Sequence, residues 1–474
     1  MSSGPAGRSA AAAGNRPGPG LRRELGALQS YAALLGILVG AGIFRVTAEA
    51  AQATGPGVLL GHLLLTPLVL ATAVPYLAFA STPLGREPGG EYAHLRAVFR
   101  SDAVGFLAGW LKIVAYLGAG AYLGGACADY GIELAQQFGL PLEPARWRLP
   151  FALGALSFFA LVHAAGVRWY GRVQVAMCAV LGVAIAVLVV PGLFAIEPAR
   201  LQPLLPNGVS GLARSLPPLL FAYAGFESLA QTAGETRDPA SLPRVFVRGI
   251  LGTALIFMAM TAVAFGVLSN ARIQESSAPM SEAAAQYLPF GATALVTVGA
   301  IFAITTSINA TLFVPARLAW IMARDGLLPG PLAAVHAGSG VPRVAVAASW
   351  AGMVLLLWSG QVALALGIAV AGLMLLYLAH GLALLLLPRL VPDLYARAAA
   401  TVPRRLQVAA GVISVLGMAA ILAVQFRADA ARIAGAAFWD RAGDGELTSL
   451  ELLLAWSAVG AVLYAVRPSR STAR

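Results

Sequence analysis

The run GILVGAGIFRVT at positions 36–47 has a composition that favours ligand binding. It places Gly40, Ala41 and Gly42 in succession inside the first long apolar segment of the chain. Glycine costs a helix interior about 1 kcal/mol relative to alanine, so these residues predict a break in a helix or the close approach of another backbone. Inside a bilayer, freed N–H and C=O groups are tolerated only where they face protein, water or a ligand. The run is therefore a candidate binding site.

A second apolar run, FAYAGFESLAQTAGE at 221–235, has a similar interruption. It places Gly225 in mid-run and Glu227 two residues later. An ionisable residue inside an apolar span is costly and by default marks a functional pathway. The alternative is a Glu227 that is neutralised by a proton or by a neighbouring hydroxyl and has a purely structural role.

Two broken helices supply polar backbone groups of both signs. The exposed N–H groups at the start of a half-helix favour an anion, and the carbonyls at the end of the other half favour a cation. A molecule with a carboxylate and an ammonium on one carbon satisfies both sets. The pattern therefore suits a zwitterion such as an amino acid, with no charged side chain of the protein touching it.

The composition places these runs in a membrane protein. The chain has 474 residues, of which 59% are hydrophobic and 11% charged, and its mean hydropathy is +0.78. These values lie outside the range of soluble domains and predict a polytopic protein in a lipid bilayer. The net charge of +11 comes from basic residues scattered between apolar runs. This distribution indicates membrane orientation and no nucleic-acid partner.

A membrane helix needs about 20 mostly apolar residues, and this criterion predicts an all-α protein with twelve spans. The two interrupted runs fall in the first and sixth spans, the same place in successive five-span blocks. That arrangement is typical of inverted repeats with a site between broken helices. The spans are predicted at 27–53, 57–82, 103–135, 149–165, 169–195, 213–233, 244–268, 290–320, 342–359, 362–387, 403–425 and 447–466.

The arginines predict the orientation. An even number of spans puts both termini on one side, and the tails and loops of that side hold most of the arginines, which indicates cytoplasmic N- and C-termini by the positive-inside rule. The predicted location is the cell (inner) membrane. The outer loops hold the smaller set Arg146, Arg148, Arg200, Arg214, Arg272, Arg427, Arg432 and Arg441.

The organisation predicted from these spans has five parts. They are a disordered cytoplasmic tail at 1–25, a first repeat at 26–195, a second repeat at 205–388, two additional helices at 400–467 and a tail at 468–474.

Two connecting segments are patterned as short helices. REPGGEYAHLRAVFR at 86–100 has a Pro-Gly-Gly turn, and then an amphipathic helix that is a candidate inner gate. PMSEAAAQYLPF at 279–290 predicts a short helix capped by Ser281, a candidate outer lid. The apolar side of the first helix consists of Tyr92, Leu95, Val98 and Phe99.

Several motifs resemble the amino acid–polyamine–organocation (APC) permeases. They are GAGIF at 40–44, PGGEY at 88–92, GFLAGW at 105–110, FAYAGFE at 221–227 followed by GETRDP and LPR, and SINATLFVPARLAWIMARDGLLP at 307–329. They follow the family's order over most of the first ten spans. The resemblance implies the leucine-transporter fold, in which two inverted five-helix repeats are followed by two further helices, and alternating access.

The resemblance also implies site residues. The glycine-rich turn that binds a carboxylate in the family matches Gly40, Ala41, Gly42 and the amide of Ile43. The carbonyls that bind an ammonium match Leu38, Phe221 and Ala224, with Gly225 at the second break. The aromatic gate of many members is most similar to Phe221 or Phe226.

The resemblance leaves the coupling ion open. Glu227 matches a proton- or pH-sensing glutamate of part of the family, and Thr306 and Ser307, beside Thr305, match a region that holds the ion in sodium-coupled relatives. Some members carry a lysine in span 5, but VQVAMCAVLGV has no basic residue there, and Lys112 lies in span 3 instead. Proton symport through Glu227 and exchange of one substrate for another both stay possible.

Other candidate residues have ordinary alternatives. Cys127 and Cys178 lie in apolar runs, which predicts neither a disulfide nor a metal site. His62, His163 and His380 have no ligand-spaced partners, so packed histidines are expected.

The loop DRAGDGELTSLE at 440–451 has the acidic spacing of a calcium-binding EF-hand. Its third position is Ala442, which removes a ligand. We favour the alternative, in which Thr448 caps the last span and Glu451 completes a capping box.

Charged residues at two span ends also allow two interpretations. Arg317, Arg324 and Asp325 are either gating partners of Glu235 and Asp238 or positive-inside anchors. Arg45 either lines the outer pathway or extends toward the surface.

These features together predict a secondary active transporter of amino acids that works by alternating access, with proton-coupled symport as the main hypothesis. An amino acid/amine exchanger and a carrier of another small solute on the same fold are the alternatives. A membrane-embedded enzyme would need clustered His, Asp or Glu within the spans, so no enzyme and no cofactor are predicted. A non-transporting partner subunit should have lost the two breaks, and both are present.

Overall fold

The computed structural model describes residues 27–40, 42–86, 89–227, 242–276, 278–399, 402–443 and 446–467. The predicted terminal tails, Ala41 and the segment 228–241 lie outside these residues. The described chain is helical, and its only pairing of extended backbone is an isolated bridge between His336 and Val341.

The helices follow the predicted spans closely. Their bounds are α1 (Ala27–Leu38), a π-helical turn (Gly42–Val46), α2 (Thr47–Thr54), α3 (Val58–Ala80), α4 (Glu91–Phe99), α5 (Asp102–Gln137), α6 (Pro144–Ala165), α7 (Val167–Gly192), α8 (Gly208–Tyr223), α10 (Leu242–Val267), α11 (Asn270–Glu275), α12 (Pro279–Ala285), α13 (Phe290–Arg324), α14 (Arg343–Trp358), α15 (Val362–Leu390), α16 (Pro392–Ala399), α17 (Arg404–Gly435), α18 (Phe438–Gly443) and α19 (Ser449–Val466).

Within the described ranges, nine helical stretches are long and apolar enough to cross a membrane. One of them, Leu34–Ala80, runs over the break after α1 and includes α2 and α3. The apolar helix α14 is shorter, and α8 ends just before the segment that is not described. The protein is therefore a multi-pass, all-helical membrane protein, as its composition predicts.

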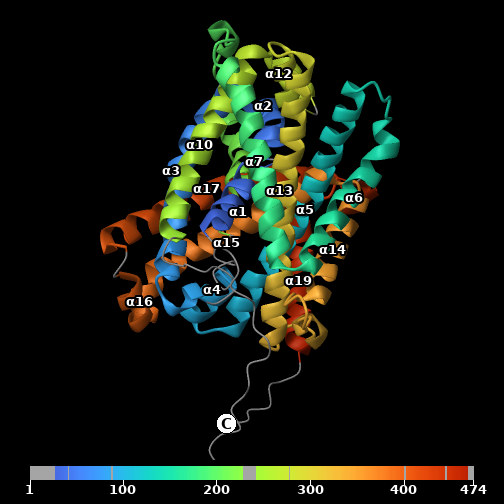
Figure 1. Cartoon of the computed structure of the whole chain (residues 1–474). Helices are drawn as coiled ribbons and strands as arrows, with labels where there is room; N and C mark the ends of the chain where they lie inside the picture. The colour runs from blue at the N-terminus through green and yellow to red at the C-terminus, as the bar shows by residue number, and fades with distance from the viewer. Residues whose placement is uncertain are drawn as a thin grey trace, which may run out of the picture.

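Helices α5 and α13 form the centre of the bundle (Figure 1). In their most apolar windows, 78% of α5 and 67% of α13 is buried, against 22% of α6 and 28% of α7. Small residues such as Gly118 and Gly120 allow this, because a Cβ on Gly118 would lie 2.5 Å from the Ala365 carbonyl of α15. The central helices therefore face protein, and α6 and α7 present apolar side chains to lipid.

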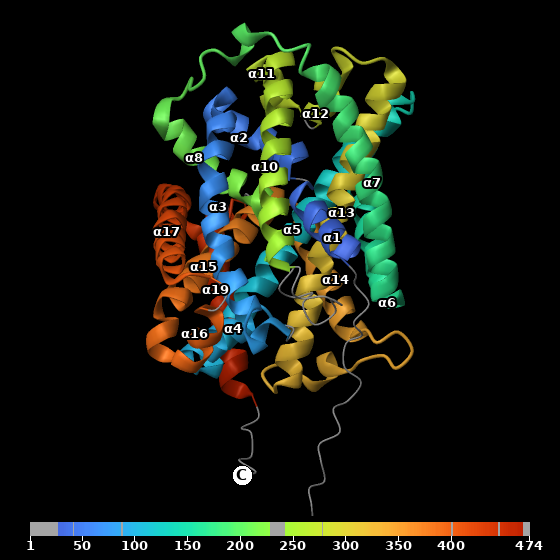
Figure 2. The same ribbon diagram turned by 60° about the vertical axis from the view of Figure 1, so that its left-hand side comes forward.

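The two ends of the bundle differ in the helices that cover them. Helices α2, α11 and α12 lie at one end, and α4, α16 and the end of α19 lie at the other (Figures 1 and 2). We call the second one the α4 end. The predicted amphipathic helix at 91–99 is α4, with Tyr92, Leu95 and Val98 buried and Phe99 partly buried.

Helix capping confirms one prediction and corrects another. Thr448 and Glu451 form the capping box that begins α19. Glu451 also pairs with Arg441, so the residue at the last position of the EF-hand pattern is already engaged, while Asp444 and Gly445 lie outside the described residues. Ser281 does not cap α12: the N-cap is Ala278, because Pro279 already occupies the first helical turn.

Side chains that were considered alone in the sequence have different surroundings in the structure. Both cysteines are free thiols, and they lie on different helices, α5 and α7. His380 is not isolated: its Nε2 atom lies 3.0 Å from Nδ1 of His94, a residue of α4 that the spacing of the sequence did not connect to it. The fold brings together two histidines that are far apart in the chain.

Candidate functional site

The first predicted break lies where the glycines indicate. Helix α1 ends at Leu38, Val39 and Gly40 are not helical, and a π-helical turn begins at Gly42. A Cβ on Gly40 would lie 1.6 Å from the Ser307 Oγ atom of α13. Glycine is therefore required at this position by the close approach of α13, as well as by the loss of helix.

The second break follows α8. The helix ends at Tyr223, Ala224 is extended, and Gly225 has a φ of +107°, a conformation that L side chains rarely adopt. A Cβ on Gly225 would lie 2.5 Å from the Ile37 side chain at the end of α1. The rest of the predicted sixth span, from residue 228, lies outside the described residues.

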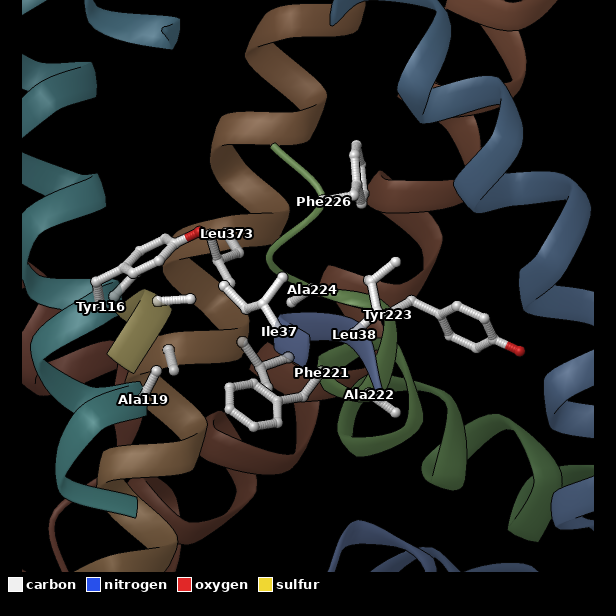
Figure 3. Close-up of a cluster of buried hydrophobic side chains, with 14 of the residues drawn as sticks. Ile37, Leu38, Tyr116, Ala119, Phe221, Ala222, Tyr223, Ala224, Phe226 and Leu373 are labelled. Atoms are coloured by element: carbon white, nitrogen blue, oxygen red, sulfur yellow. The ribbon is translucent and has the colours of Figure 1, made fainter. Parts of the chain in front are cut away.

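The two breaks are in direct contact. A Cβ on Gly42 would lie 2.4 Å from the Ala222 Cα atom, so the chain after the first break touches the backbone of α8. Figure 3 shows Ile37 and Leu38 beside the segment from Phe221 to Ala224. The fold therefore places the two interrupted segments, which are far apart in the sequence, at one point inside the bundle.

A small cavity of about 30 Å³ lies at this point. It has room for water but not for an amino acid, so the space between the two breaks is contracted in this structure. Its wall combines both breaks with α5, α13 and α15, and it consists of Ile37, Gly42, Tyr116, Ala119, Leu123, Phe221, Ala224, Gly225, Ser307, Thr311 and Leu373.

Five of the residues predicted from the sequence line the cavity: Gly42, Phe221, Ala224, Gly225 and Ser307. Leu38, Gly40 and Ile43 are buried and not among the lining residues. Of the two aromatic candidates, Phe221 lines the cavity, whereas Phe226 stacks on Tyr377 with ring centres 5.4 Å apart and points away from it (Figure 3). Of these two candidates, Phe221 is therefore the one that faces the cavity.

Glu227 lies outside the cavity and accepts three hydrogen bonds. Its Oε1 atom accepts from the Tyr116 hydroxyl at 2.7 Å, and its Oε2 atom accepts from the Tyr377 hydroxyl at 2.7 Å and from the Gly225 N–H at 2.9 Å. The side chain is fully buried. Tyr116 also lines the cavity and Gly225 forms the break, so these hydrogen bonds join Glu227 to the residues around the cavity.

The hydroxyls of α13 hold the end of α1. Thr306 Oγ1 donates to the Gly36 carbonyl at 2.7 Å, and Ser307 Oγ donates to the carbonyls of Gly36 and Ile37 at 3.2 Å. The Gln174 amide, from α7, donates to the Thr306 carbonyl at 3.3 Å. These protein donors satisfy the carbonyls that a cation would otherwise take as ligands at the end of α1.

The site is suited to reversible binding rather than to covalent chemistry. The turn that starts at Gly42 leaves its first N–H groups without partners in the helix, and a carbonyl such as that of Phe221, which accepts from Ala224, keeps a second lone pair. No group of three or more His, Cys, Asp or Glu side chains in the described residues could hold a metal ion.

Comparison with known proteins gives the same picture. A family model for amino acid permeases matches residues 25–439. The chain belongs to the amino acid permease family. Membership places it among transporters rather than enzymes, as the sequence predicts.

Individual relatives cover about two thirds of the chain. The chain is 27% identical over 69% of its length to the branched-chain amino acid permease BcaP of Bacillus subtilis, of which the match covers 72%. It is 34% identical over 68% of its length to the uncharacterized transporter Rv1999c of Mycobacterium tuberculosis, covering 70% of that protein. It is 28% identical over 67% of its length to the chloroplastic cationic amino acid transporter 9 of Arabidopsis thaliana, covering 58% of that protein.

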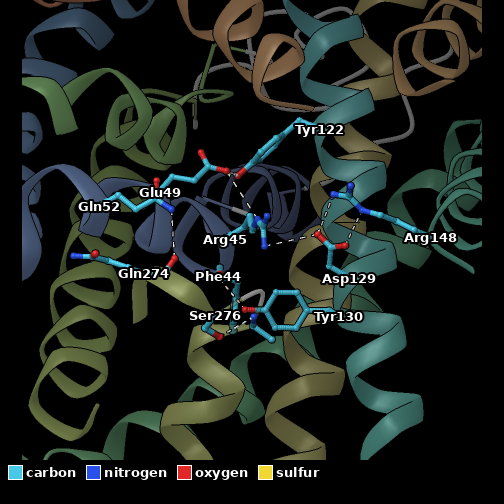
Figure 4. A network of polar contacts seen from close by, with 11 residues as sticks. Phe44, Arg45, Glu49, Gln52, Tyr122, Asp129, Tyr130, Arg148, Gln274 and Ser276 are labelled. Atoms are coloured by element: carbon cyan, nitrogen blue, oxygen red, sulfur yellow. Dashed lines mark hydrogen bonds and ion pairs between the residues drawn. The ribbon is translucent and has the colours of Figure 1, made fainter. Parts of the chain in front are cut away.

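A network of charged residues joins the segment after the first break to α5 and α6 (Figure 4). We name it the outer network, and the one at the α4 end the inner network, after the predicted orientation. Arg45 lies 3.7 Å from Asp129, which also binds Arg148 at 2.8 Å. The Tyr122 hydroxyl donates to Glu49 at 2.9 Å. Arg45 therefore connects two elements instead of extending to the surface.

An inner network joins α4 to α13 at the opposite end. Arg96 pairs with Asp325 at 2.5 Å and with Asp102 at 2.7 Å, and the Tyr92 hydroxyl donates to Asp325 at 2.6 Å. Burial and the bond to Asp325 raise the pKa of the Tyr92 hydroxyl. Asp325 thus contacts α4; its expected partners Glu235 and Asp238 lie outside the described residues.

Several residues of the site could not be found by motif. Tyr116, Leu123 and Leu373 line the cavity, and Tyr377 binds Glu227. In the sequence they are ordinary apolar or aromatic residues of long helices. No motif marks these positions of α5 and α15, because an apolar residue of a long helix looks the same in the sequence whether it faces a cavity or another helix.

Proposed function

We propose that the protein is a secondary active transporter that carries an amino acid across the cell membrane by alternating access, coupled to protons. The observation that carries the proposal is the contact between two broken spans at one closed cavity. The N–H groups after the first break suit a carboxylate. The carbonyls of Leu38 and Phe221, which differ from the Gly36 and Ile37 carbonyls that Thr306 and Ser307 already bond, suit an ammonium.

The walls of the cavity favour a substrate with an apolar side chain. Ile37, Leu123, Phe221 and Leu373 supply aliphatic and aromatic surface, and the lining residues that the structure describes include no carboxylate to pair with a basic side chain. Among the relatives, a branched-chain amino acid permease fits this lining better than a cationic amino acid transporter. We therefore propose leucine, isoleucine and valine as the first substrates to test.

Glu227 is the proposed coupling residue. It is fully buried and bound to Tyr116, a wall of the cavity, and to Gly225 in the second break. Protonation removes the negative charge that holds these donors, so proton binding and reshaping of the site are linked. Sodium is less well supported, because the hydroxyls of Thr306 and Ser307 already bond to the end of α1.

The outer and inner networks are proposed as the two gates. The outer network ties Arg45 and Glu49 to α5, and the inner network ties Arg96 to Asp325. The contacts of both networks are formed in the structure, and we assign this arrangement to an occluded step between opening to one side and to the other. Alternating access requires that one network break while the other holds.

The proposed architecture has twelve spans. The interrupted first span consists of α1, the turn at Gly42 and α2, and the sixth begins with α8. The remaining spans are α3, α5, α6, α7, α10, α13, α14, α15, α17 and α19. In this arrangement residues 26–195 and 205–388 are the inverted repeats, 400–467 adds two helices, and the α4 end, with both termini, faces the cytoplasm of the inner membrane.

Uptake by the purified protein in proteoliposomes tests the function. Labelled leucine, lysine and glutamate are offered with a proton gradient, with a sodium gradient and with neither. Accumulation of leucine that requires the proton gradient supports the proposal. Uptake that requires only unlabelled substrate on the other side identifies an exchanger, and absence of uptake for every amino acid contradicts the proposed function.

A further inference from the structure

A buried ion pair joins α4 to α5 close to the cavity. Lys112 Nζ lies 2.5 Å from Glu91 Oε2, and both side chains are 0% exposed. The Tyr76 hydroxyl of α3 donates to the other carboxylate oxygen of Glu91 at 2.5 Å. A fully buried charge pair is costly in desolvation and gives little net stability, so its presence in a transporter suggests a role other than holding the fold.

Two histidines tie the same short helix to α15. His94, three residues after Glu91, lies 3.0 Å from His380, and Phe79 stacks on both imidazole rings with centres 4.6 and 5.1 Å away. The Tyr76 ring lies 4.2 Å from that of His380. Helix α4 is thus bound to α3, α5 and α15 through groups that can gain or lose protons.

This cluster adjoins the proposed coupling residue. Lys112 Nζ lies 5.6 Å from the centre of the Tyr116 ring, and the Tyr116 hydroxyl donates to Glu227. Tyr377, which binds the other oxygen of Glu227, lies one helical turn before His380 on α15. The cluster therefore continues from Glu227 to α4, the helix that covers one end of the bundle.

The surroundings of the two histidines disfavour a positive charge on either ring. Both rings are buried, and the positive charge of Lys112 adds to that effect. Glu91 is the carboxylate of the cluster and is paired directly with Lys112. When Glu91 is protonated, the ion pair is lost and the Lys112 ammonium stays buried without its counter-charge. That state is unfavourable until α4 moves and water reaches Lys112.

We propose that Glu91 is a second proton-binding site of the transporter, distinct from Glu227, and that its protonation releases α4 and opens the cavity toward the α4 end. The proton forms an O–H bond on the Glu91 carboxylate, and Lys112 keeps its own proton. In the closed state Lys112 and the Tyr76 hydroxyl both donate to Glu91 and stabilise its negative charge. In the open state these two bonds are lost. The Glu91 carboxylate therefore binds a proton more tightly in the open state. By linkage, protons at the α4 end favour opening. The role of Glu91 in transport rests on the proposed function, whereas the pH-dependent opening of the cavity toward the α4 end does not.

A cysteine in the cavity measures this opening directly. Ala119, a lining residue, is replaced by Cys in a chain with Cys127→Ala and Cys178→Ala. The rate of labelling by a membrane-impermeant maleimide is followed in vesicles whose α4 end faces the reagent, at a series of pH values on that side only. The same measurement on a chain that also carries Glu91→Gln and Lys112→Met serves as reference, because both chains share the intrinsic pH dependence of the thiol.

We divide the labelling rate of the chain that keeps Glu91 and Lys112 by the labelling rate of the chain in which both are replaced, which we call the paired variant. This ratio should rise as the pH falls. Adding Glu227→Gln should preserve this rise, and Tyr76→Phe, which removes one donor to Glu91, should move it to higher pH. A ratio that stays constant with pH, or a cysteine that is never labelled, overturns the proposal. If the variant with Glu91→Gln and Lys112→Met does not fold, the labelling rate of the same cysteine in the unfolded chain serves as the reference instead. A Tyr76→Phe chain whose normalised labelling rate depends on pH as that of the unaltered chain does would then overturn the proposal.

The readout separates this inference from the proposed function. A rising ratio in a protein that transports no amino acid in proteoliposomes would retain the proton site and reject the function. A constant ratio in a protein that accumulates leucine would do the reverse.

Discussion

The Tyr116 hydroxyl donates a 2.7 Å hydrogen bond to the Glu227 carboxylate, and the same tyrosine forms part of the cavity wall. One side chain therefore connects a buried acid to the space where a ligand would lie. Tyr377 binds the second oxygen of the same carboxylate from α15. A change of charge on Glu227 would therefore alter its hydrogen bonds with α5, with α15 and with the Gly225 N–H at the second break.

Glu227→Gln should flatten the dependence of uptake on pH. The amide keeps the shape of the side chain but cannot exchange a proton, so a step that needs Glu227 to titrate no longer responds to pH. Initial uptake rates in proteoliposomes across a series of external pH values measure this. Glu197→Gln, an exposed residue before α8, is the matched control and should leave the profile as it is. An identical profile for the Glu227 variant excludes its coupling role.

Gly42→Val should abolish substrate binding while the protein still inserts. Its Cβ would meet the Ala222 backbone at 2.4 Å, so the two broken spans must separate and the cavity must change shape. Ligand-dependent thermal stabilisation of the purified protein reports binding. Gly154→Ala on α6, whose Cβ would have nothing within 4 Å, is the control and should bind normally. Unchanged affinity in the valine variant would argue against this cavity as the substrate site.

Ser307→Ala should lower the free energy of unfolding by about 0.5–1.5 kcal/mol, because the buried Ile37 carbonyl loses a donor while the Gly36 carbonyl keeps its bond from Thr306. Unfolding followed by intrinsic fluorescence measures the change. Ser359→Ala, in an exposed turn, is the comparison and should be nearly neutral. If sodium instead held the end of α1, sodium would stabilise the unaltered protein, and this observation would contradict the proposed absence of sodium coupling.

Asp325→Asn should favour opening at the α4 end. The increase in labelling rate relative to the unaltered chain should be the same at each pH value near neutrality. The substitution weakens the contacts with Arg96 and Tyr92 that join α13 to α4. The raised pKa of Tyr92 keeps its hydroxyl protonated and donating throughout this range, so pH does not alter the contact. Labelling of the Ala119→Cys reporter measures opening, with Asp393→Asn on α16 as the control. A strongly pH-dependent effect would show that the inner network itself titrates.

Arg45 and Asp129 should be coupled in the outer gate. Arg45→Met and Asp129→Asn each remove one partner of a contact between the first span and α5, so each should increase access from the outer side. In a double-mutant cycle the combined variant should show less than the sum of the two effects, because the second substitution removes a contact that is already lost. Strictly additive effects on labelling of the same reporter would mean that the pair does not act as a gate.

The sequence by itself determined the membrane class, the positions of the helices and the two breaks. Apolar runs of spanning length leave the backbone no alternative to helix in lipid, and the breaks lie at Gly40, Gly42 and Gly225. Glycine alone does not decide this, because Gly118 and Gly120 stay helical within α5. Glu227 could be singled out for the same reason, since a carboxylate within an apolar run is costly whatever surrounds it. The capping box at Thr448 is likewise local and was readable from the spacing of two residues.

Only the tertiary structure decided which residues meet. Tyr116 and Tyr377 bind Glu227, Glu91 pairs with Lys112, and His94 faces His380, although each partner lies on a different helix. Helical periodicity fixes the face of each helix but not the neighbour that the face packs against. The choice between Phe221 and Phe226 was undetermined for the same reason. The direction of the Phe226 side chain, beyond the break, depends on the backbone geometry at Ala224 and Gly225, where Gly225 lies against Ile37 of α1.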